Sequence, residues 1–200
     1  LKRYGLEREI NNTLRRLGPV PPDLAYLKGK DLRDYYLAAQ VCQDFAYENR
    51  WNMAMTILRG LELWHEDSFT TMHNYFDIGS RIIRKGAVRA EKYERLIIPL
   101  NMRDGSLICR GKGNEDWLCS APHGAGRLMS RAKAKETLTM EEYSKEMRGI
   151  YSTSVCESTI DESPMAYKSA EEIESLIGDT VEVVKRIKPI YNFKAKGQRT

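Results

Sequence analysis

The chain has 200 residues, of which 42% are hydrophobic and 30% are charged, and this length is sufficient to bury a hydrophobic core. It contains no run of about 18 apolar residues, so the composition excludes a membrane-spanning helix and we expect no membrane partner. The first residues lack the charged-then-apolar pattern of a secretory signal, and the four cysteines form no C-x-x-C pair. We therefore expect a cytoplasmic protein with reduced thiols.

The net charge of +4 is unevenly distributed along the chain. Residues 81–135 contain 13 Lys or Arg against five Asp or Glu. Such a basic region attracts polyanions, including nucleotides and nucleic acids, although many ordinary solvated surfaces are also basic.

Residues 31–64 are rich in helix formers, and Leu37, Val41 and Phe45 recur at a spacing of four residues. This spacing places them on one face of a helix and predicts a long core helix. The preceding G-P-V-P-P at residues 18–22 predicts an extended lead-in, because proline breaks a helix.

After Asp67 the chain alternates between short apolar runs and turn residues, which predicts strands at residues 72–76, 81–83, 96–99 and 106–109. Helices are predicted at residues 126–135 and 139–148, the second with a capping box from Thr139 to Glu142, and again after Ser169. Residues 183–194, interrupted by Pro189, predict a closing strand. The expected class is α+β, with a mixed β-sheet core and flanking helices in a single unit.

The segment C-S-A-P-H-G-A-G-R-L-M-S-R at residues 119–131 presents His123 beside two glycines. Glycines allow backbone N–H groups to approach an anion, and a helix starting at Gly126 would place Arg127 and Arg131 on one face. A neutral imidazole can attack phosphorus near pH 7. The alternatives are a nucleophile beside a phosphate cradle and a tight turn with an incidental histidine.

A second histidine, His73, is followed by Asn74 in a predicted strand. His73 could ligate a divalent metal and Asn74 could contact a phosphate oxygen. The alternative is a core histidine satisfied by the backbone, whereas His65 is typical of a solvated helix end. The basic run at residues 84–89 and the turn at residues 99–106 are consistent with charged hairpins.

In this order, these segments resemble the C-terminal half of the RtcB-type RNA-splicing ligases. The resemblance rests on His73-Asn74, R-K-G-A at 84–87, the turn at 99–106, R-G-K-G-N at 110–114, the His123 motif at 120–131, D-E-S-P-M-A-Y-K at 161–168 and K-P-I-Y-N-F-K at 188–194. It implies that residues 1–200 are the C-terminal part of a ligase catalytic domain, with the N-terminal half missing.

The resemblance implies an enzyme that uses GTP and Mn²⁺. Its RNA partners carry a 2′,3′-cyclic phosphate or a 3′-phosphate on one end and a 5′-hydroxyl on the other. The histidine matching His123 attacks the α-phosphorus of GTP and becomes guanylylated. The guanylyl group then passes to the RNA 3′-phosphate, and the 5′-hydroxyl displaces GMP.

Carried over residue by residue, the resemblance makes His73 a manganese ligand and His123 the nucleophile. The implied nucleotide-binding residues are His73, Asn74, Pro99, Leu100, Asn101, Met102, Ser106, His123, Gly124, Ala125, Gly126, Tyr167 and Lys194, while Arg127 and Arg131 are assigned to phosphate or RNA. Leu100-Asn101 stand where many members carry Gly-Ser. The other metal ligands of the family belong to its N-terminal half, so a non-catalytic nucleotide- or RNA-binding module is the alternative function.

Overall fold

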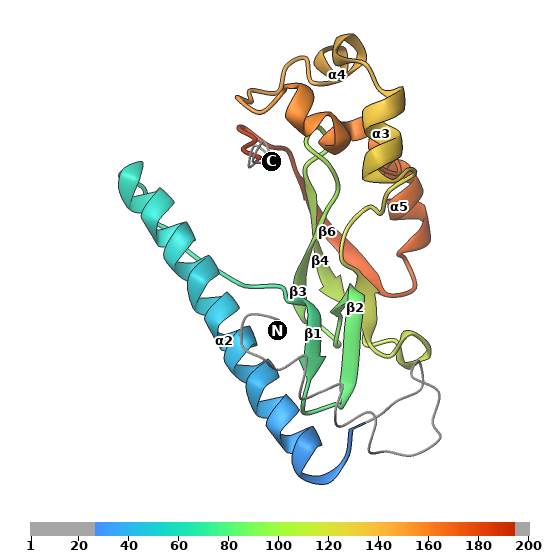
Figure 1. The fold of residues 1–200 in the computed structure, drawn as a ribbon. Coiled ribbons are helices and arrows are strands. Elements are labelled where there is room, and N and C mark those ends of the chain that lie inside the picture. The colour runs from blue at the N-terminus through green and yellow to red at the C-terminus, as the bar shows by residue number, and fades with distance from the viewer. Residues whose placement is uncertain (1–26, 195–200) are drawn as a thin grey trace. The chain divides into compact units, whose positions relative to one another are not determined.

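A computed structural model describes residues 27–194, so the predicted lead-in at residues 18–22 lies outside the described range (Figure 1). The helices are α2 (Gly29–Gly60), α3 (Arg131–Thr137), α4 (Met140–Glu146) and α5 (Ala170–Leu176), with 3₁₀ helices η3 (Glu115–Trp117), η4 (Glu157–Glu162) and η5 (Pro164–Ala166). The strands are β1 (His73–Asp77), β2 (Ile82–Arg89), β3 (Arg95–Pro99), β4 (Ser106–Gly111), β5 (Ser120–Pro122) and β6 (Val181–Ile187). This composition confirms the predicted α+β class.

The strands form two three-stranded sheets, in the orders β1-β2-β5 and β3-β4-β6. The β2–β5, β3–β4 and β4–β6 pairs are all antiparallel. The predicted sheet core therefore takes the form of two antiparallel sheets. The closing strand ends at Ile187, two residues before Pro189, which has no N–H to continue a ladder.

Contacts divide the described chain into two compact units. The first contains α2 and the tip of the β1–β2 hairpin at residues 75–82, and the second contains residues 67–74 and the chain from residue 83 onward. Every predicted site residue belongs to the second unit. The single domain expected over residues 1–200 stays a prediction.

Helix α2 confirms the predicted helix but corrects its predicted role as a core element. The predicted apolar stripe is exposed, by 68% at Leu37, 67% at Val41 and 71% at Phe45. Within the described residues, none of the 32 residues of α2 is buried. Within the first unit the helix instead contacts the hairpin tip through Tyr36, whose ring centroid lies 4.5 Å from that of Phe76. Because each residue turns a helix by about 100°, this contacting face is not the predicted apolar stripe.

No helix in the described range is both long enough and apolar enough to cross a bilayer.

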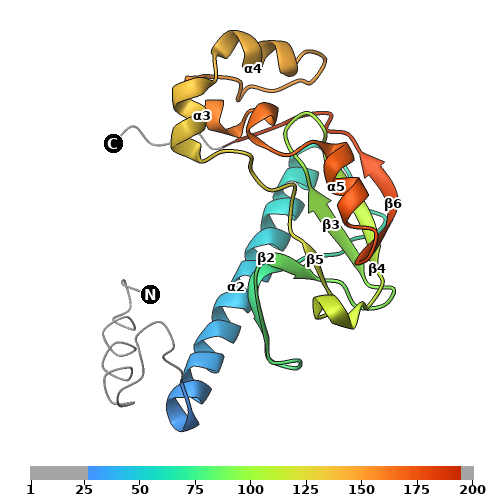
Figure 2. The ribbon, with the colours of Figure 1, turned by 90° about the vertical axis from the view of Figure 1, so that its right-hand side faces the viewer.

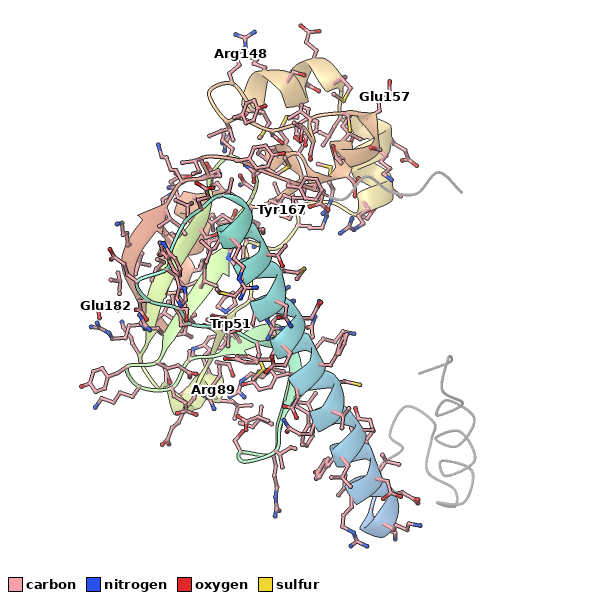
Figure 3. All side chains as sticks on the ribbon, turned by 90° about the vertical axis from the view of Figure 1, so that its left-hand side faces the viewer. Trp51, Arg89, Arg148, Glu157, Tyr167 and Glu182 are labelled. Atoms are coloured by element: carbon pink, nitrogen blue, oxygen red, sulfur yellow. The ribbon has the colours of Figure 1, made fainter. Side chains whose placement is uncertain are left out.

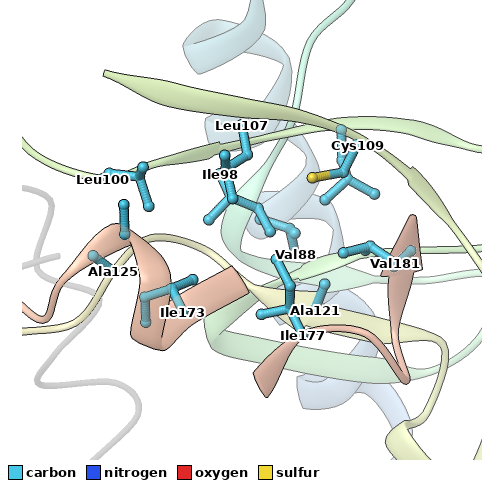
Figure 4. Packing of buried hydrophobic residues seen from close by; sticks show 13 residues of the cluster. Val88, Ile98, Leu100, Leu107, Cys109, Ala121, Ala125, Ile173, Ile177 and Val181 are labelled. Atoms are coloured by element: carbon cyan, nitrogen blue, oxygen red, sulfur yellow. The ribbon is translucent and has the colours of Figure 1, made fainter. Parts of the chain in front are cut away.

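The core of the second unit joins both sheets to α5 (Figures 2 and 4). Leu96 and Ile98 of β3 pair with Cys109 and Leu107 of β4, and these four side chains are at most 1% exposed. Side chains alternate between the two faces of a strand, so this register buries one face of each strand. The cluster comprises Val88, Ala90, Leu96, Ile98, Leu100, Leu107, Cys109, Ala121, Ala125, Ala170, Ile173, Ile177 and Val181.

Side-chain caps define the three short helices. Thr139 and Glu142 form the predicted capping box of α4, and the Ser169 hydroxyl accepts a hydrogen bond from the Glu172 N–H at the start of α5. The helix predicted from Gly126 is corrected, because α3 begins only at Arg131 and is capped by Ser130. Gly126 has a φ of +72°, which no right-handed helix accepts.

Candidate active site

The two predicted functional histidines lie side by side in the second unit. His73 is the first residue of β1, and His123 follows β5 directly. Their ring centroids are 5.4 Å apart and the ring planes differ by 23°, so the imidazoles are stacked. Strand β2 lies between β1 and β5 and carries Gly86, where a Cβ would lie 3.7 Å from Cε1 of His123.

The backbone of Gly86 connects the two histidine segments. Its N–H donates to Oδ1 of Asn74 at 2.8 Å, and its carbonyl oxygen accepts from the N–H of His123 at 3.4 Å. Both Gly86 and Asn74 have positive φ, at +71° and +53°. The Asn74 side chain therefore supports the local backbone here, and its predicted phosphate contact stays a prediction.

Within residues 27–194, no group of three or more His, Cys, Asp or Glu side chains gathers in a way that could hold a metal ion. His73 contributes one imidazole, and a manganese centre needs several nitrogen or oxygen ligands. The described residues therefore do not by themselves fit the manganese site that the resemblance implies. The chemistry derived from them is that of the protein groups alone.

The predicted guanine-binding residues surround one cavity of about 250 Å³. It is lined by Pro99, Leu100, Asn101, Met102, Ser106, Tyr167 and Lys194, joined by Gly105, Glu162, Ile187, Lys188, Pro189 and Asn192. The structure thus brings together seven predicted residues from segments about 90 positions apart. Their contact with a base stays a prediction.

Asn101 shapes the turn that forms one wall of this cavity. Its Oδ1 accepts from the N–H groups of Arg103 at 3.0 Å and Asp104 at 2.8 Å, and its Nδ2 donates to the Asp104 carboxylate at 2.8 Å. Asparagine commonly stabilises turns in this way. The local role of the side chain is therefore to hold the loop between β3 and β4.

The segment from His123 to Gly126 is attached to the same wall. The N–H of Ala125 donates to the carbonyl oxygen of Pro99 at 3.1 Å, and the Ala125 side chain is buried in the core beside Ile98 and Leu100 (Figure 4). A Cβ on Gly124 would lie 3.1 Å from that Pro99 oxygen, closer than side chains normally approach. The core and a glycine therefore hold the chain just after His123 against Pro99, a residue of the cavity wall.

The predicted nucleotide-binding residues of the histidine segment do not line this cavity. They border a second, mainly apolar cavity of about 490 Å³, and they are His123, Gly124, Ala125 and Gly126. Gly86 and Lys168 line it as well.

Arg127, which was assigned to phosphate or RNA, points into the protein. Its guanidinium donates to the carbonyl oxygens of Met129 and Asp161 and to the Tyr167 hydroxyl at 2.8 Å. It also lies 4.7 Å from the centroid of the Tyr167 ring, in the range of cation–π contacts. Its local role is to fix Tyr167, and its contact with phosphate or RNA stays a prediction.

Arg131 is more exposed, with 68% of its side chain accessible. Its Nη1 lies 2.9 Å from Oδ2 of Asp161 and 3.0 Å from Oε1 of Glu162. Arg127 and Arg131 do not share a helical face, because only Arg131 belongs to α3. They meet instead at the adjacent residues Asp161 and Glu162, whose side chains are 5% and 14% exposed; Arg127 contacts the Asp161 carbonyl oxygen and the Glu162 carboxylate.

Glu162 and Tyr167 have mutually dependent pKa values. Burial alone would raise the pKa of Glu162, but the hydrogen bond from Tyr167 and the charges of Lys194 and Arg131 outweigh it and lower that pKa. Burial, together with the hydrogen bond to Glu162, raises the pKa of Tyr167 to about 12. At neutral pH the cavity therefore contains a carboxylate and a neutral phenol.

The sequence predicted no role for Gly86 or Glu162. Gly86 nevertheless stands in R-K-G-A at 84–87, and Glu162 in D-E-S-P-M-A-Y-K at 161–168. The signal for Gly86 was a glycine within a run of basic residues that directly follows a predicted strand. The signal for Glu162 was a pair of carboxylates in a chain segment otherwise rich in small residues.

Comparisons with known proteins agree on one family. The family model described as tRNA-splicing ligase RtcB matches residues 7–195. The chain is 34% identical over 207 residues to the RNA-splicing ligase RtcB of Escherichia coli (strain K12), covering 94% of this chain and 50% of that protein. It is 29% identical over 205 residues to the tRNA-splicing ligase RtcB of Aeropyrum pernix, covering 82% and 42%. The chain therefore spans about half the length of the curated relatives it matches.

Proposed function

This chain belongs to the RtcB family of tRNA-splicing ligases, and from that premise we propose that the whole protein is a GTP- and manganese-dependent RNA ligase. It joins an RNA end bearing a 2′,3′-cyclic phosphate or a 3′-phosphate to a 5′-hydroxyl end. The observation that carries the proposal is the stacking of His73 on His123, whose ring centroids are 5.4 Å apart, on a segment that Ala125 ties to Pro99 of the cavity formed by the predicted guanine-binding residues. A cytoplasmic location stays a prediction.

In the proposed reaction, one imidazole nitrogen of His123 attacks the α-phosphorus of GTP. A phosphorus–nitrogen bond forms, the bond to the bridging oxygen of the β-phosphate breaks, and pyrophosphate leaves. A cyclic RNA end is first hydrolysed to a 3′-phosphate, which then takes the guanylyl group from His123. Finally, the 5′-hydroxyl of the second RNA attacks that phosphate and releases GMP.

The residues of this chain contribute position and charge to these steps. The loop at residues 99–102 and the Tyr167 ring enclose the base, and the Lys194 ammonium donates to it. The hydrogen bond from Ala125 to Pro99 keeps His123 in fixed register with the base-binding cavity. Holding the reacting groups in this way lowers the entropic part of the barrier.

The test is covalent labelling of the full-length protein with α-³²P-GTP and Mn²⁺. We expect a labelled adduct in the wild type and in the control His65→Ala, and no adduct in His123→Ala. Persistence of the label in His123→Ala would remove His123 as the nucleophile. Binding of GTP or RNA by the wild type without any adduct would favour the non-catalytic binding module.

The same assay separates the contribution of these 200 residues from that of the whole protein. Because the described residues do not assemble a metal centre, we expect the 200-residue chain by itself to form no adduct.

A further inference from the structure

We propose that Glu162 is a positioning residue of the base-binding cavity. Its carboxylate holds the side chains of Lys194 and Tyr167 and thereby sets the selection of guanine over adenine. This inference rests on the proposed function, because it concerns the same nucleotide site.

The geometry places Glu162 at the centre of the polar part of the cavity. Its Oε2 accepts from the Tyr167 hydroxyl at 2.8 Å and from Nζ of Lys194 at 3.2 Å. All three residues line the cavity of about 250 Å³. One carboxylate oxygen is thus shared by the two groups that the proposed function places against the base.

The other carboxylate oxygen is held from outside the cavity. Oε1 lies 3.0 Å from Nη1 of Arg131 and 3.7 Å from Nη1 of Arg127. The Glu162 side chain is only 14% exposed, so it has little freedom to leave these partners. The two arginines fix the orientation of the carboxylate, and the carboxylate fixes the two cavity side chains.

Lys194 needs such a partner, because a lysine side chain is long and flexible. Its backbone is anchored separately, since its N–H donates to Oγ of Ser154 at 2.9 Å. Glu162 therefore acts on the ammonium group and not on the path of the chain. Loss of the carboxylate should free the ammonium while leaving the segment in place.

The fixed ammonium distinguishes the two purine bases. It has three donors and no acceptor, so one proton can serve Glu162 while another meets the base. Guanine presents a carbonyl oxygen at the edge where adenine presents an amino donor. An ammonium held at that edge can donate a hydrogen bond to the guanine carbonyl oxygen. It offers no acceptor to the adenine amino group, which is left without a partner.

The experiment measures adduct formation by the full-length protein as a function of nucleotide concentration. For Glu162→Gln we expect the KM for GTP to rise about tenfold, the loss expected for a charge-assisted hydrogen bond. The maximal rate should stay within about twofold, because His123 is untouched, and the preference for GTP over ATP should fall by a similar factor. The matched control is Glu157→Gln, an exposed residue of the same 3₁₀ helix (Figure 3).

A double-mutant cycle with Lys194→Met tests whether Glu162 acts through Lys194. We expect Glu162→Gln to cause little further change in base preference once Lys194 is replaced, because the Lys194 ammonium is the group that distinguishes the two bases. Independent, additive effects of the two substitutions on base preference would overturn the proposal.

Glu162→Asp provides a second variant that keeps the charge facing the arginines if Glu162→Gln fails to fold. Its shorter side chain should also raise the KM for GTP and weaken the preference over ATP. An unchanged KM and preference in the folded variants would overturn this inference. If the wild type forms no adduct, the proposed function itself fails, so the two failures are distinguishable.

Discussion

The site depends on a glycine at position 86. Gly86 lies in β2 between the strands that carry His73 and His123, and its φ is +71°. A Cβ at this position would lie 3.7 Å from Cε1 of His123, which is an ordinary contact. The requirement for glycine therefore comes mainly from the backbone conformation, which is strained for residues with a Cβ.

Gly86→Ala should lower the free energy of unfolding by roughly 1–2 kcal/mol, because alanine pays the cost of a left-handed conformation. It should also slow adduct formation, since relaxation of the strand moves the hydrogen bond partner of His123. Urea denaturation and guanylylation kinetics measure the two effects.

Gly178→Ala is the matched control, because Gly178 has no positive φ and a Cβ there would meet nothing within 4 Å. Equal destabilisation by both substitutions would contradict the role assigned to the Gly86 backbone.

At the scale of secondary structure elements, α4 supports the cavity from outside. Its Tyr143 is fully buried, and the Tyr143 hydroxyl lies 3.2 Å from Sδ of Met102, a residue of the cavity wall. The helix has only seven residues, which is too short to be stable by itself. Its packing and its capping box therefore determine whether it forms.

Thr139→Ala should destabilise the protein by about 1 kcal/mol, because it removes the side chain that accepts from the N–H of Glu142 at 3.2 Å. Ser144→Ala on the exposed face of the same helix should cost nothing, since alanine is the better helix former. Thermal melts followed by circular dichroism compare the two variants. A larger loss from Ser144→Ala would show that the cap contributes little.

At the scale of the whole molecule, the larger of two hydrophobic clusters in the second unit connects strands of both sheets to α5. It contains Val88 of β2, Ile98 of β3 and Ile173 of α5, and Ala125 attaches the nucleophile segment to it (Figure 4). Burial of these side chains is the main stabilising contribution, so damage to the core should affect the site indirectly.

Ile98→Ala should cost about 2–5 kcal/mol, because Ile98 is completely buried and its loss leaves a cavity. Ile83→Ala, on a strand residue that is 69% exposed, should cost less than about 1 kcal/mol. Denaturant midpoints of the full-length variants check the difference. Similar midpoints for the two would contradict the assigned core.

The sequence by itself determined the features that depend on neighbouring residues. The strands at residues 96–99 and 106–109 follow from short apolar runs bounded by turn residues, and the α4 cap follows from Thr139 and Glu142 at their three-residue spacing. The ordered motifs around His73 and His123 likewise indicated the family that the comparisons show.

Only the tertiary structure decided which partners those residues meet. The stacking of His73 on His123, the inward direction of Arg127 and the central place of Glu162 join segments 30 or more positions apart, and no local pattern specifies such contacts. The same limit explains the corrected core helix, because periodicity reveals an apolar face but not whether anything covers it. Local rules act over a few residues, whereas burial and charge pairing depend on the fold as a whole.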